Sequence, residues 1–386
     1  MVWRDSIAFP LSDEETMACD LAGDFAAKEV APLAAKIDQE HYFPRELIPQ
    51  MGGLGLMGAT VPVEFGGAGL STVAYALIIE ELSSACASTG IIVSAHTSLC
   101  ITPILDYGTQ EQKEKFLPML ASGKALGCFA LSEPGTGSDA AAITTTYKKD
   151  GDEFILNGTK NWITNAPEAG VCVVFASSDT SKGSKGITAF VHEMNLPGIS
   201  LGKREDKMGI RGSPTSSITY TDVRLPKGSA LNLENRGFVV AMTTLNGGRI
   251  GVASQAVGIA RSAFDDALRY SQERKAFGKR VCEHQSIQNY FADMVCHIDS
   301  SRYLTLDAAL RKDQGRSYVR QAAMAKLFAS ETAMMCAAKG IQIHGGYGFV
   351  TDYPAERHLR DAKITEIYEG TSEIQRVLIA TQLTKD

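Results

Sequence analysis

The chain has 386 residues, of which 44% are hydrophobic and 21% charged, so it is long enough for two or three domains and can bury a sizeable core. Its 38 basic and 44 acidic residues give a net charge of −6. This balance argues against nucleic acid as the main partner, because a phosphate-backbone binder carries a basic surface.

The eight cysteines are dispersed without any C-x-x-C pair. We therefore predict no metal site and no disulfide framework, and we expect a reducing compartment. The first fifteen residues include four acids and no apolar core segment, which is typical of neither a signal peptide nor a transit peptide. His96 and Pro103 interrupt the most apolar stretch, residues 90–106, so we predict no membrane insertion. The expected location is cytoplasmic, or the mitochondrial matrix if the chain is a mature form.

Residues 1–124 are predicted to form an N-terminal helical domain. Residues 14–37 are rich in Ala, Leu and Glu, with apolar positions recurring every three or four residues. Further helical patterns cover residues 72–87 and 110–123. Glycine-rich breaks at 52–58 and 66–69 separate these segments.

Residues 125–232 are predicted to form a middle antiparallel β-barrel domain, with a sandwich as the alternative. Short segments rich in Val, Ile, Thr and aromatic residues recur about every ten residues, bounded by Gly, Pro, Asn and Asp. No helical pattern interrupts them, which argues against alternating strand–helix units.

Residues 233–386 are predicted to form a C-terminal four-helix bundle. Long helical patterns return here, with short connections between four long helices. The fold class is therefore α+β multidomain: a helical domain, a β domain and a bundle. Two apolar stripes carry the helical prediction: Ile287, Phe291, Met294 and Ile298, then Met324, Phe328 and Met335.

Two glycine loops match dinucleotide fingerprints by letter but not by context. Gly53–Gly58 follows a helical pattern, and the loop beginning at Gly135 leads into a strand-like segment instead of a helix. Neither is a Rossmann site, and no P-loop motif occurs. Backbone N–H groups in the turn at 135–138 can still form an anion site, and an ordinary interdomain turn is the alternative.

The C-terminal segment contains the strongest candidate for chemistry. Ser372 and Gln375 resemble a capping box, which would place Glu369 and Gly370 just before a helix N-terminus. A carboxylate there, next to a glycine and free N–H groups, suits a general base with an oxyanion donor. By physics alone, an ordinary first-turn acid remains the favoured alternative.

Three other residues are candidates with simpler interpretations. His344 lies beside two glycines and is interpreted as structural. Arg274 is interpreted as a solvated charge near the end of a long helix. Trp162 is interpreted as a core residue, with stacking on a cofactor as the alternative.

Six motifs together resemble the signature blocks of the acyl-CoA dehydrogenases, and the likeness covers nearly the whole chain. The resemblance is strongest to the short-chain, butyryl-CoA-type enzymes. It implies the three-domain fold already inferred, FAD as the cofactor, an acyl-CoA substrate, an electron-transferring flavoprotein as acceptor, and a homotetramer that is a dimer of dimers. The motifs are ALSEPGTGSDA (130–140), KNWITNA (160–166), EDKMGIRGSPT (205–215), RKAFG (274–278), QIHGGYGF (342–349) and IYEGTSEIQ (367–375).

The resemblance also implies roles for individual residues. Glu369 matches the catalytic base, and no carboxylate stands at Gly248, where some relatives carry that base. Thr164 would hydrogen-bond near flavin N5, and Asn246 stands where the family usually has Asp. Residues that match FAD contacts are Phe129, Leu131, Ser132, Gly137, Ser138, Trp162, Ile163, Thr164, Thr371 and Glu373, with Arg274, Gln285, Gln342, Ile343, Gly345 and Gly346 acting across a subunit interface. Residues that match substrate contacts are Ser138, Asn246, Arg249 and Gly370.

The implied reaction is α,β-dehydrogenation of an acyl-CoA thioester. Glu369 would remove the α proton while the β hydrogen passes as hydride to flavin N5. Burial is expected to raise the pKa of Glu369, against the helix dipole. Alternatives are an enoyl-CoA reductase, an oxidase that uses O₂, a branched or cyclic substrate, and a non-catalytic CoA-binding scaffold.

Overall fold

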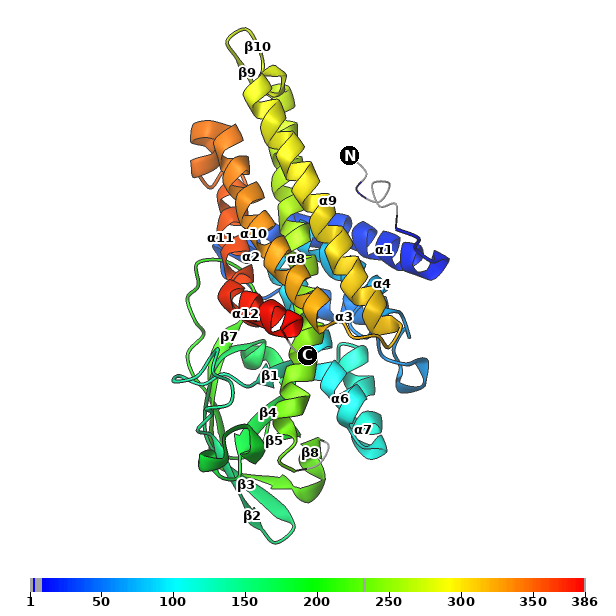
Figure 1. The fold of residues 1–386 in the computed structure, drawn as a ribbon, viewed down its shortest axis with the longest axis vertical. Coiled ribbons are helices and arrows are strands. Elements are labelled where there is room, and N and C mark those ends of the chain that lie inside the picture. Colours follow the sequence, from blue (N-terminus) through cyan, green and yellow to red (C-terminus); the bar gives the residue numbers. More distant parts are fainter. Residues whose placement is uncertain (1–2, 4–8, 232–233, 385–386) are drawn as a thin grey trace.

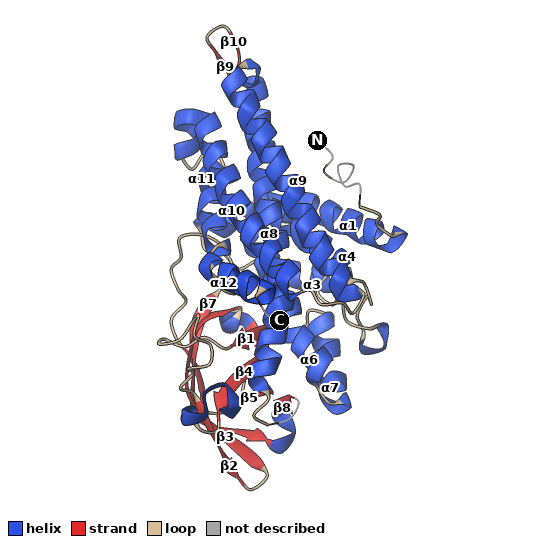
Figure 2. Ribbon diagram, viewed as in Figure 1, coloured by secondary structure: helices blue, strands red, loops and turns tan. Residues whose placement is uncertain are grey.

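The computed structural model describes residue 3 and residues 9–231 and 234–384, which form helical, β and helical zones in chain order. The β zone occupies one end of an elongated molecule, and a small hairpin projects at the other end (Figure 1). Almost all strands lie in that β zone, while helices fill the rest (Figure 2). This order confirms the predicted fold class.

The N-terminal zone is helical because its helices have strong start signals and apolar faces. Ser12 and Glu15 form a capping box at the first helix, and Thr109 and Gln112 form one at the last. The helices are α1 (Asp13–Phe25), α2 (Ala34–Gln39), α3 (Leu47–Gly53), α4 (Thr72–Ala85), α5 (Ala87–Ser94), α6 (Thr102–Tyr107) and α7 (Gln110–Ala121).

A π-helical segment, Ala95–Ile101, joins α5 to α6 into one long apolar run. Within the described part of the chain, Ala87–Tyr107 is the one helical stretch long and apolar enough to cross a membrane, and 94% of its apolar 18-residue window is buried inside the protein. Such burial is typical of a core helix. His96 shows how the run is held: its Nδ1 accepts from the Gly127 N–H at 2.9 Å, while Nε2 lies 3.2 Å from the Leu120 carbonyl oxygen.

The middle zone is one eight-stranded sheet in the order β6-β7-β3-β2-β4-β5-β8, with β1 beside β4. The antiparallel prediction holds for most neighbours, but β1 runs parallel to β4, and one parallel bridge joins β2 to β4. The pattern missed this because strand propensity carries no information on direction. The strands are β1 (Leu126–Ala130), β2 (Thr146–Asp150), β3 (Glu153–Thr164), β4 (Ala169–Ser177), β5 (Ile187–Glu193), β6 (Ile199–Leu201), β7 (Thr215–Pro226) and β8 (Ala230–Leu231).

The C-terminal zone has three long helices, of 37, 29 and 26 residues, so the prediction of four long helices was wrong. The two remaining helices have only 11 and 12 residues. A two-residue-per-strand hairpin separates the first two long helices. The elements are α8 (Gly237–Glu273), β9 (Lys275–Ala276), β10 (Lys279–Arg280), α9 (Gln285–Asp313), α10 (Val319–His344), α11 (Ala355–Thr365) and α12 (Ser372–Leu383).

The buried face of α10 also differs from the predicted stripe. Met324, Phe328 and Met335 are only half-buried, whereas the fully buried positions are mostly alanines and Lys326. Small residues allow α10 to approach α8 closely: a Cβ on Gly340 would lie 3.3 Å from the Ala263 carbonyl oxygen. A search for large apolar side chains misses such a face.

Buried ion pairs join the N-terminal and C-terminal helical zones. Arg261 on α8 pairs with Glu81 of α4 at 2.8 Å, and Arg302 on α9 pairs with Glu80 of α4 at 3.0 Å. All four side chains are less than a tenth exposed. Losing one partner from such a network leaves an uncompensated buried charge, so these pairs fix the helices in one arrangement.

Candidate active site

Glu369 lies in a tight turn between α11 and α12. Its φ is 53°, and the φ of Gly370 is 97°, so two consecutive residues have left-handed backbone. This conformation is costly for a non-glycine residue and is a mark of functional sites. The helix N-cap is Thr371, whose side chain accepts from the Ile374 N–H at 3.3 Å.

The predicted capping box of Ser372 and Gln375 was therefore wrong, because Ser372 is already the first helical residue. The Gln375 side chain turns back instead and donates to the carbonyl oxygens of Glu369 and Gly370, at 3.3 and 2.9 Å. Glu369 does lie just before the helix N-terminus, as predicted.

The carboxylate of Glu369 lies over Gly248 of α8. A Cβ built on Gly248 would stand 2.0 Å from Glu369 Oε2 and 2.9 Å from Leu99 Cδ2. The two sequence positions considered for the base therefore meet in space. The missing side chain at 248 is what makes room for the carboxylate at 369.

The electrostatics of this pocket suit proton abstraction. Burial raises the pKa of Glu369 to about 7, against the opposing charges of Lys326 and Arg249. The predicted rise in the pKa is confirmed, and the charges that oppose it are the two cations Lys326 and Arg249. Glu369 Oε2 is buried and has no hydrogen-bond partner. An unpartnered carboxylate oxygen with a pKa near neutrality is equipped to take up a proton.

Arg249 and Asn246 form the next turn of α8 beside the base. Arg249 is 6% exposed, and its Nη1 donates to Asn246 Oδ1. Arg249 Nε is buried without a partner. The asparagine thus keeps the hydrogen bond that an aspartate would make but brings no negative charge toward the guanidinium.

The two predicted flavin segments of the β zone lie side by side. The Asn161 N–H donates to the Ser132 carbonyl oxygen at 2.8 Å. Lys160 Nζ donates to Glu133 Oε1 at 2.8 Å and to the Leu131 carbonyl oxygen at 3.1 Å. This buried pair connects the loop after β1 to the end of β3.

Trp162 is not a core residue: 61% of it is exposed, and its φ is 62°. An exposed tryptophan with left-handed backbone points to a constraint from outside the chain, so the core interpretation was wrong. Its neighbour Ile163 is buried in the β core, and Leu131 is buried where the sheet packs against helices. Phe129 and Thr164 are half-buried, and Ser138 is exposed.

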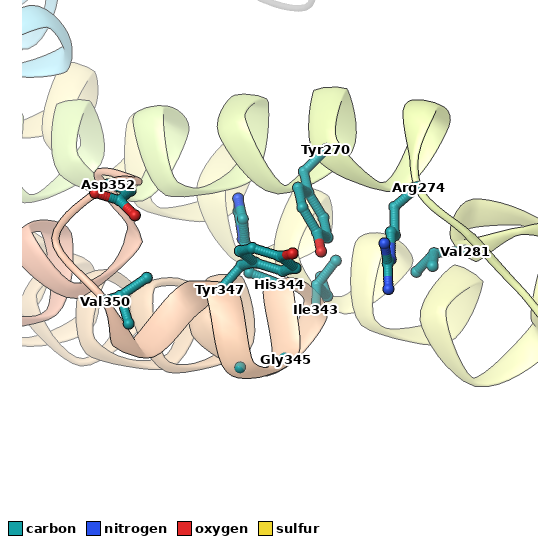
Figure 3. Close-up of a pocket in the computed structure, with 10 residues that line it drawn as sticks. Tyr270, Arg274, Val281, Ile343, His344, Gly345, Tyr347, Val350 and Asp352 are labelled. Atoms are coloured by element: carbon teal, nitrogen blue, oxygen red, sulfur yellow. The ribbon is translucent and has the colours of Figure 1, made fainter.

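A cavity of about 590 Å³ lies at the far end of α8. Tyr270 and Arg274 project from α8 toward Tyr347 and His344 (Figure 3), and the Arg274 guanidinium lies 5.8 Å from the Tyr347 ring centre. His344 stacks on Tyr270 at 4.4 Å, and its Nδ1 donates to the Gly340 carbonyl oxygen at 2.7 Å. Ile343, Gly345 and Gly346 also line this cavity, while Gln285 and Gln342 are exposed nearby.

Within a single chain, this cavity and Glu369 lie too far apart to contact the same cofactor molecule. Gly248 and Arg274 are 26 residues apart along α8, which is about 39 Å at the rise of an α-helix. The structure therefore separates the predicted FAD contacts into two groups. The predicted division of these contacts across a subunit interface fits this separation.

Several glycines in both groups have no explanation within the chain itself. A Cβ on Gly135, Gly137 or Gly346 would meet no atom within 4 Å, and none of the three has a positive φ. Neither packing nor backbone conformation requires glycine there. Close approach of a ligand or a second subunit would require it, so these segments fit an FAD dinucleotide. Gly58, in contrast, has a structural explanation, because a Cβ built there would lie only 2.5 Å from Ala121 Cβ.

The sequence reasoning missed Lys326, Leu99 and the Glu133–Lys160 pair. Both residues of the pair fall within motifs already quoted. They are 27 positions apart in the sequence, so their contact could be seen only in the folded chain. Lys326 has a sequence signal, because it is the one charged residue in the alanine-rich apolar run 322–329. Leu99 has none.

Comparison with known proteins identifies the family of the chain. Models of the acyl-CoA dehydrogenase N-terminal, middle and C-terminal domains match residues 12–124, 128–223 and 235–384. The human mitochondrial short-chain specific acyl-CoA dehydrogenase is 52% identical over 97% of this chain and 91% of its own. The solved butyryl-CoA dehydrogenase of Megasphaera elsdenii is 44% identical with a TM-score of 0.96, over 98% of this chain and all of its own.

A solved chain described with the electron transferring flavoprotein of Acidaminococcus fermentans is 46% identical, with a TM-score of 0.97, over 98% of this chain and all of its own. More distant solved relatives hold FAD or its reduced form. Taken with the matching domains, these similarities establish that the chain belongs to the acyl-CoA dehydrogenase family and is a flavin-dependent oxidoreductase with FAD as its cofactor.

Proposed function

We propose that the protein oxidises a short-chain, butyryl-CoA-like thioester to the trans-2-enoyl-CoA, with Glu369 as the base and an electron-transferring flavoprotein as the acceptor. The observation that carries the proposal is the Glu369 carboxylate, which lies over Gly248 with a buried, unpartnered oxygen. The short-chain substrate rests on the likeness to the human and Megasphaera elsdenii enzymes.

The chain's own residues act on the α proton. Glu369 takes this proton into its carboxylate, and the C–H electron pair moves toward the thioester oxygen. The Glu369 backbone N–H is the chain's donor for that developing charge, and one such donor is worth about 10²–10³ in rate. Bound FAD supplies the acceptor for the β hydrogen.

We further propose that FAD is held by the chain in two groups of residues. Phe129, Leu131, Ser132, Gly137, Ser138, Trp162, Ile163, Thr164, Thr371 and Glu373 belong to one copy, and Arg274, Gln285, Gln342, Ile343, Gly345 and Gly346 to its neighbour. The separation of about 39 Å along α8 supports this division and therefore an assembly of at least two copies. A homotetramer is proposed from the family resemblance. Ser138, Asn246, Arg249 and Gly370 are proposed to face the substrate, and the domain boundaries are proposed at 124/125 and 232/233.

Gly248→Ala is expected to lower kcat/KM by about 10²-fold, because a methyl group 2.0 Å from Glu369 Oε2 forces the base out of position. The matched control is Gly247→Ala, whose nearest neighbour would be Lys312 Nζ at 3.4 Å, an atom that can move slightly. Steady-state kinetics of both variants measure the difference. Equal activity in the two would contradict the placement of the carboxylate.

The substrate and direction are tested by anaerobic titration of the yellow protein with a panel of acyl-CoAs. We expect butyryl-CoA to bleach the flavin fastest, and the electron-transferring flavoprotein to restore the colour. Fastest bleaching by a branched or cyclic acyl-CoA would overturn the proposed substrate. Reoxidation by O₂ or by an enoyl-CoA alone would instead favour the oxidase or the reductase.

A further inference from the structure

Lys326 is a buried cation that the mechanism above leaves without a role. It lies on α10, is fully buried, and donates from Nζ to the Gly370 carbonyl oxygen at 2.7 Å. In the part of the chain that the structure describes, no carboxylate lies within 4.0 Å of its Nζ. A lysine in the middle of a helix interface is costly, because burial removes the ammonium from water.

The lysine contacts the turn that aims the base. Its hydrogen bond reaches the carbonyl of Gly370, the residue directly after Glu369. The same carbonyl accepts from Gln375 Nε2 at 2.9 Å. Two buried donors thus hold one carbonyl in the stretch where the backbone has left-handed φ angles. These two hydrogen bonds oppose relaxation of that strained turn.

Among the carboxylates around Lys326, only Glu369 is both buried and without an ion-pair partner in the described part of the chain. Glu366 pairs with Lys363 at the surface, at 2.6 Å, and Glu373 is exposed. Arg249 of α8 is the other cation facing the base, and Tyr75 of α4 and Tyr368 are neutral neighbours whose pKa values are raised. Glu369 therefore remains as the buried carboxylate that faces both cations.

The pKa shifts of Lys326 and Glu369 agree with that geometry. Burial lowers the pKa of Lys326 to about 8, and Glu369 is the strongest of the charges that oppose this fall. Lys326 in turn is the strongest of the charges that oppose the raised pKa of Glu369. Each group favours the charged form of the other.

We propose that Lys326 is a positioning residue for the reaction: it holds the Glu369–Gly370 turn through the Gly370 carbonyl and favours the ionised form of the base. The inference rests on the proposed role of Glu369. Before proton transfer, the ammonium stabilises the carboxylate. After Glu369 has taken the α proton and become neutral, the ammonium keeps its charge and its field favours the electron pair left on the substrate.

The test is Lys326→Met, which removes the charge and the donor while keeping an unbranched side chain of similar length. We expect the acid limb of the kcat/KM profile to move to higher pH by about one unit. Below the midpoint the rate then falls about tenfold at a given pH. Lys326→Gln, which removes the same charge but stays polar, is measured in parallel in case the methionine variant does not fold.

Two controls separate the effect of the Lys326 charge from the effect of its hydrogen bond to the turn. Gln375→Leu removes the other donor to the turn without changing any charge, so we expect a lower kcat with an unmoved pH midpoint. Lys363→Gln removes one positive charge at the surface, 46% exposed, and we expect no shift, because solvent screens it. An unmoved midpoint in both Lys326 variants, or an equal shift in Gln375→Leu, would overturn the proposal.

A second readout does not depend on catalysis. The carboxylic acid band of Glu369 in pH-difference infrared spectra is identified by its absence in Glu369→Gln. Its titration midpoint should rise in the Lys326 variants. If the midpoint rises in a protein that does not oxidise acyl-CoA, the proposed function is wrong, but the effect of Lys326 on the pKa of Glu369 is supported. If the protein oxidises acyl-CoA and the midpoint does not move, the proposed effect of Lys326 is wrong.

Discussion

Glu369→Gln is expected to lower the rate of acyl-CoA oxidation by about 10²–10⁴, the range typical of a lost general base. Glutamine keeps the size and polarity of the side chain but cannot accept the α proton. Because the structure raises the pKa of Glu369 to about 7, the wild-type rate is also expected to rise with pH through neutrality, as the carboxylate ionises. The residual activity of the glutamine variant should lack this rise.

The measurement is stopped-flow reduction of the bound flavin by butyryl-CoA, over a range of pH. The variant is expected to stay yellow, since Glu369 is not among the proposed FAD contacts. Flavin content by absorbance therefore serves as the control for correct folding. Near-normal bleaching by butyryl-CoA in a variant with full flavin content would show that another group is the base.

Lys160→Met is expected to destabilise the protein by about 3–5 kcal/mol, the cost of breaking a buried ion pair by removing one partner. The side chains of Lys160 and Glu133 are 0% and 2% exposed. Although burial acts to raise the pKa of Glu133, Lys160 and the hydrogen bonds from Thr144 and Thr145 lower it to about 2. Without the ammonium, a buried carboxylate remains between two segments proposed to hold FAD.

Denaturant unfolding and flavin retention measure this effect together. Lys115→Met is the matched control: its pair with Glu193, at 2.7 Å, is largely exposed, so we expect a change within about 1 kcal/mol. Combining Lys160→Met with Glu133→Gln in one double variant is expected to recover much of the loss, because no unpaired charge is then buried and the amide oxygen can still accept from the Thr144 or Thr145 N–H. A single Lys160→Met variant as stable as wild type would show that the pair does not support the loop.

Local patterns predicted the type of most elements, and the failures have identifiable causes. The helical pattern at 72–87 corresponds to α4, and the strand-like segments of the middle zone correspond to β2, β3, β4, β5 and β7. The prediction of a fourth long helix was wrong, because the chain after α10 forms two short helices, α11 and α12. The predicted buried face of α10 was wrong because mainly alanines pack at the close helix contact. A search for large apolar residues ignores alanine.

The candidate site residues that lie within a recognisable motif could be predicted from the sequence. Glu369, Arg274 and the glycine segments all come from quoted motifs, and the raised pKa of Glu369 followed from expected burial. Trp162 shows the limit of composition: tryptophan is usually buried, yet its left-handed backbone places this one at the surface. Backbone strain cannot be seen in a sequence.

The order of helical and β zones and the family motifs follow from residues that are near one another in the chain. The site itself depends on residues that are not. Gly248, Lys326 and Glu369 stand on α8, α10 and the turn before α12, and only packing brings a carboxylate over a bare glycine with a buried lysine behind it. Burial sets the pKa of such a base, and burial is a property of the packed helices and not of any one segment.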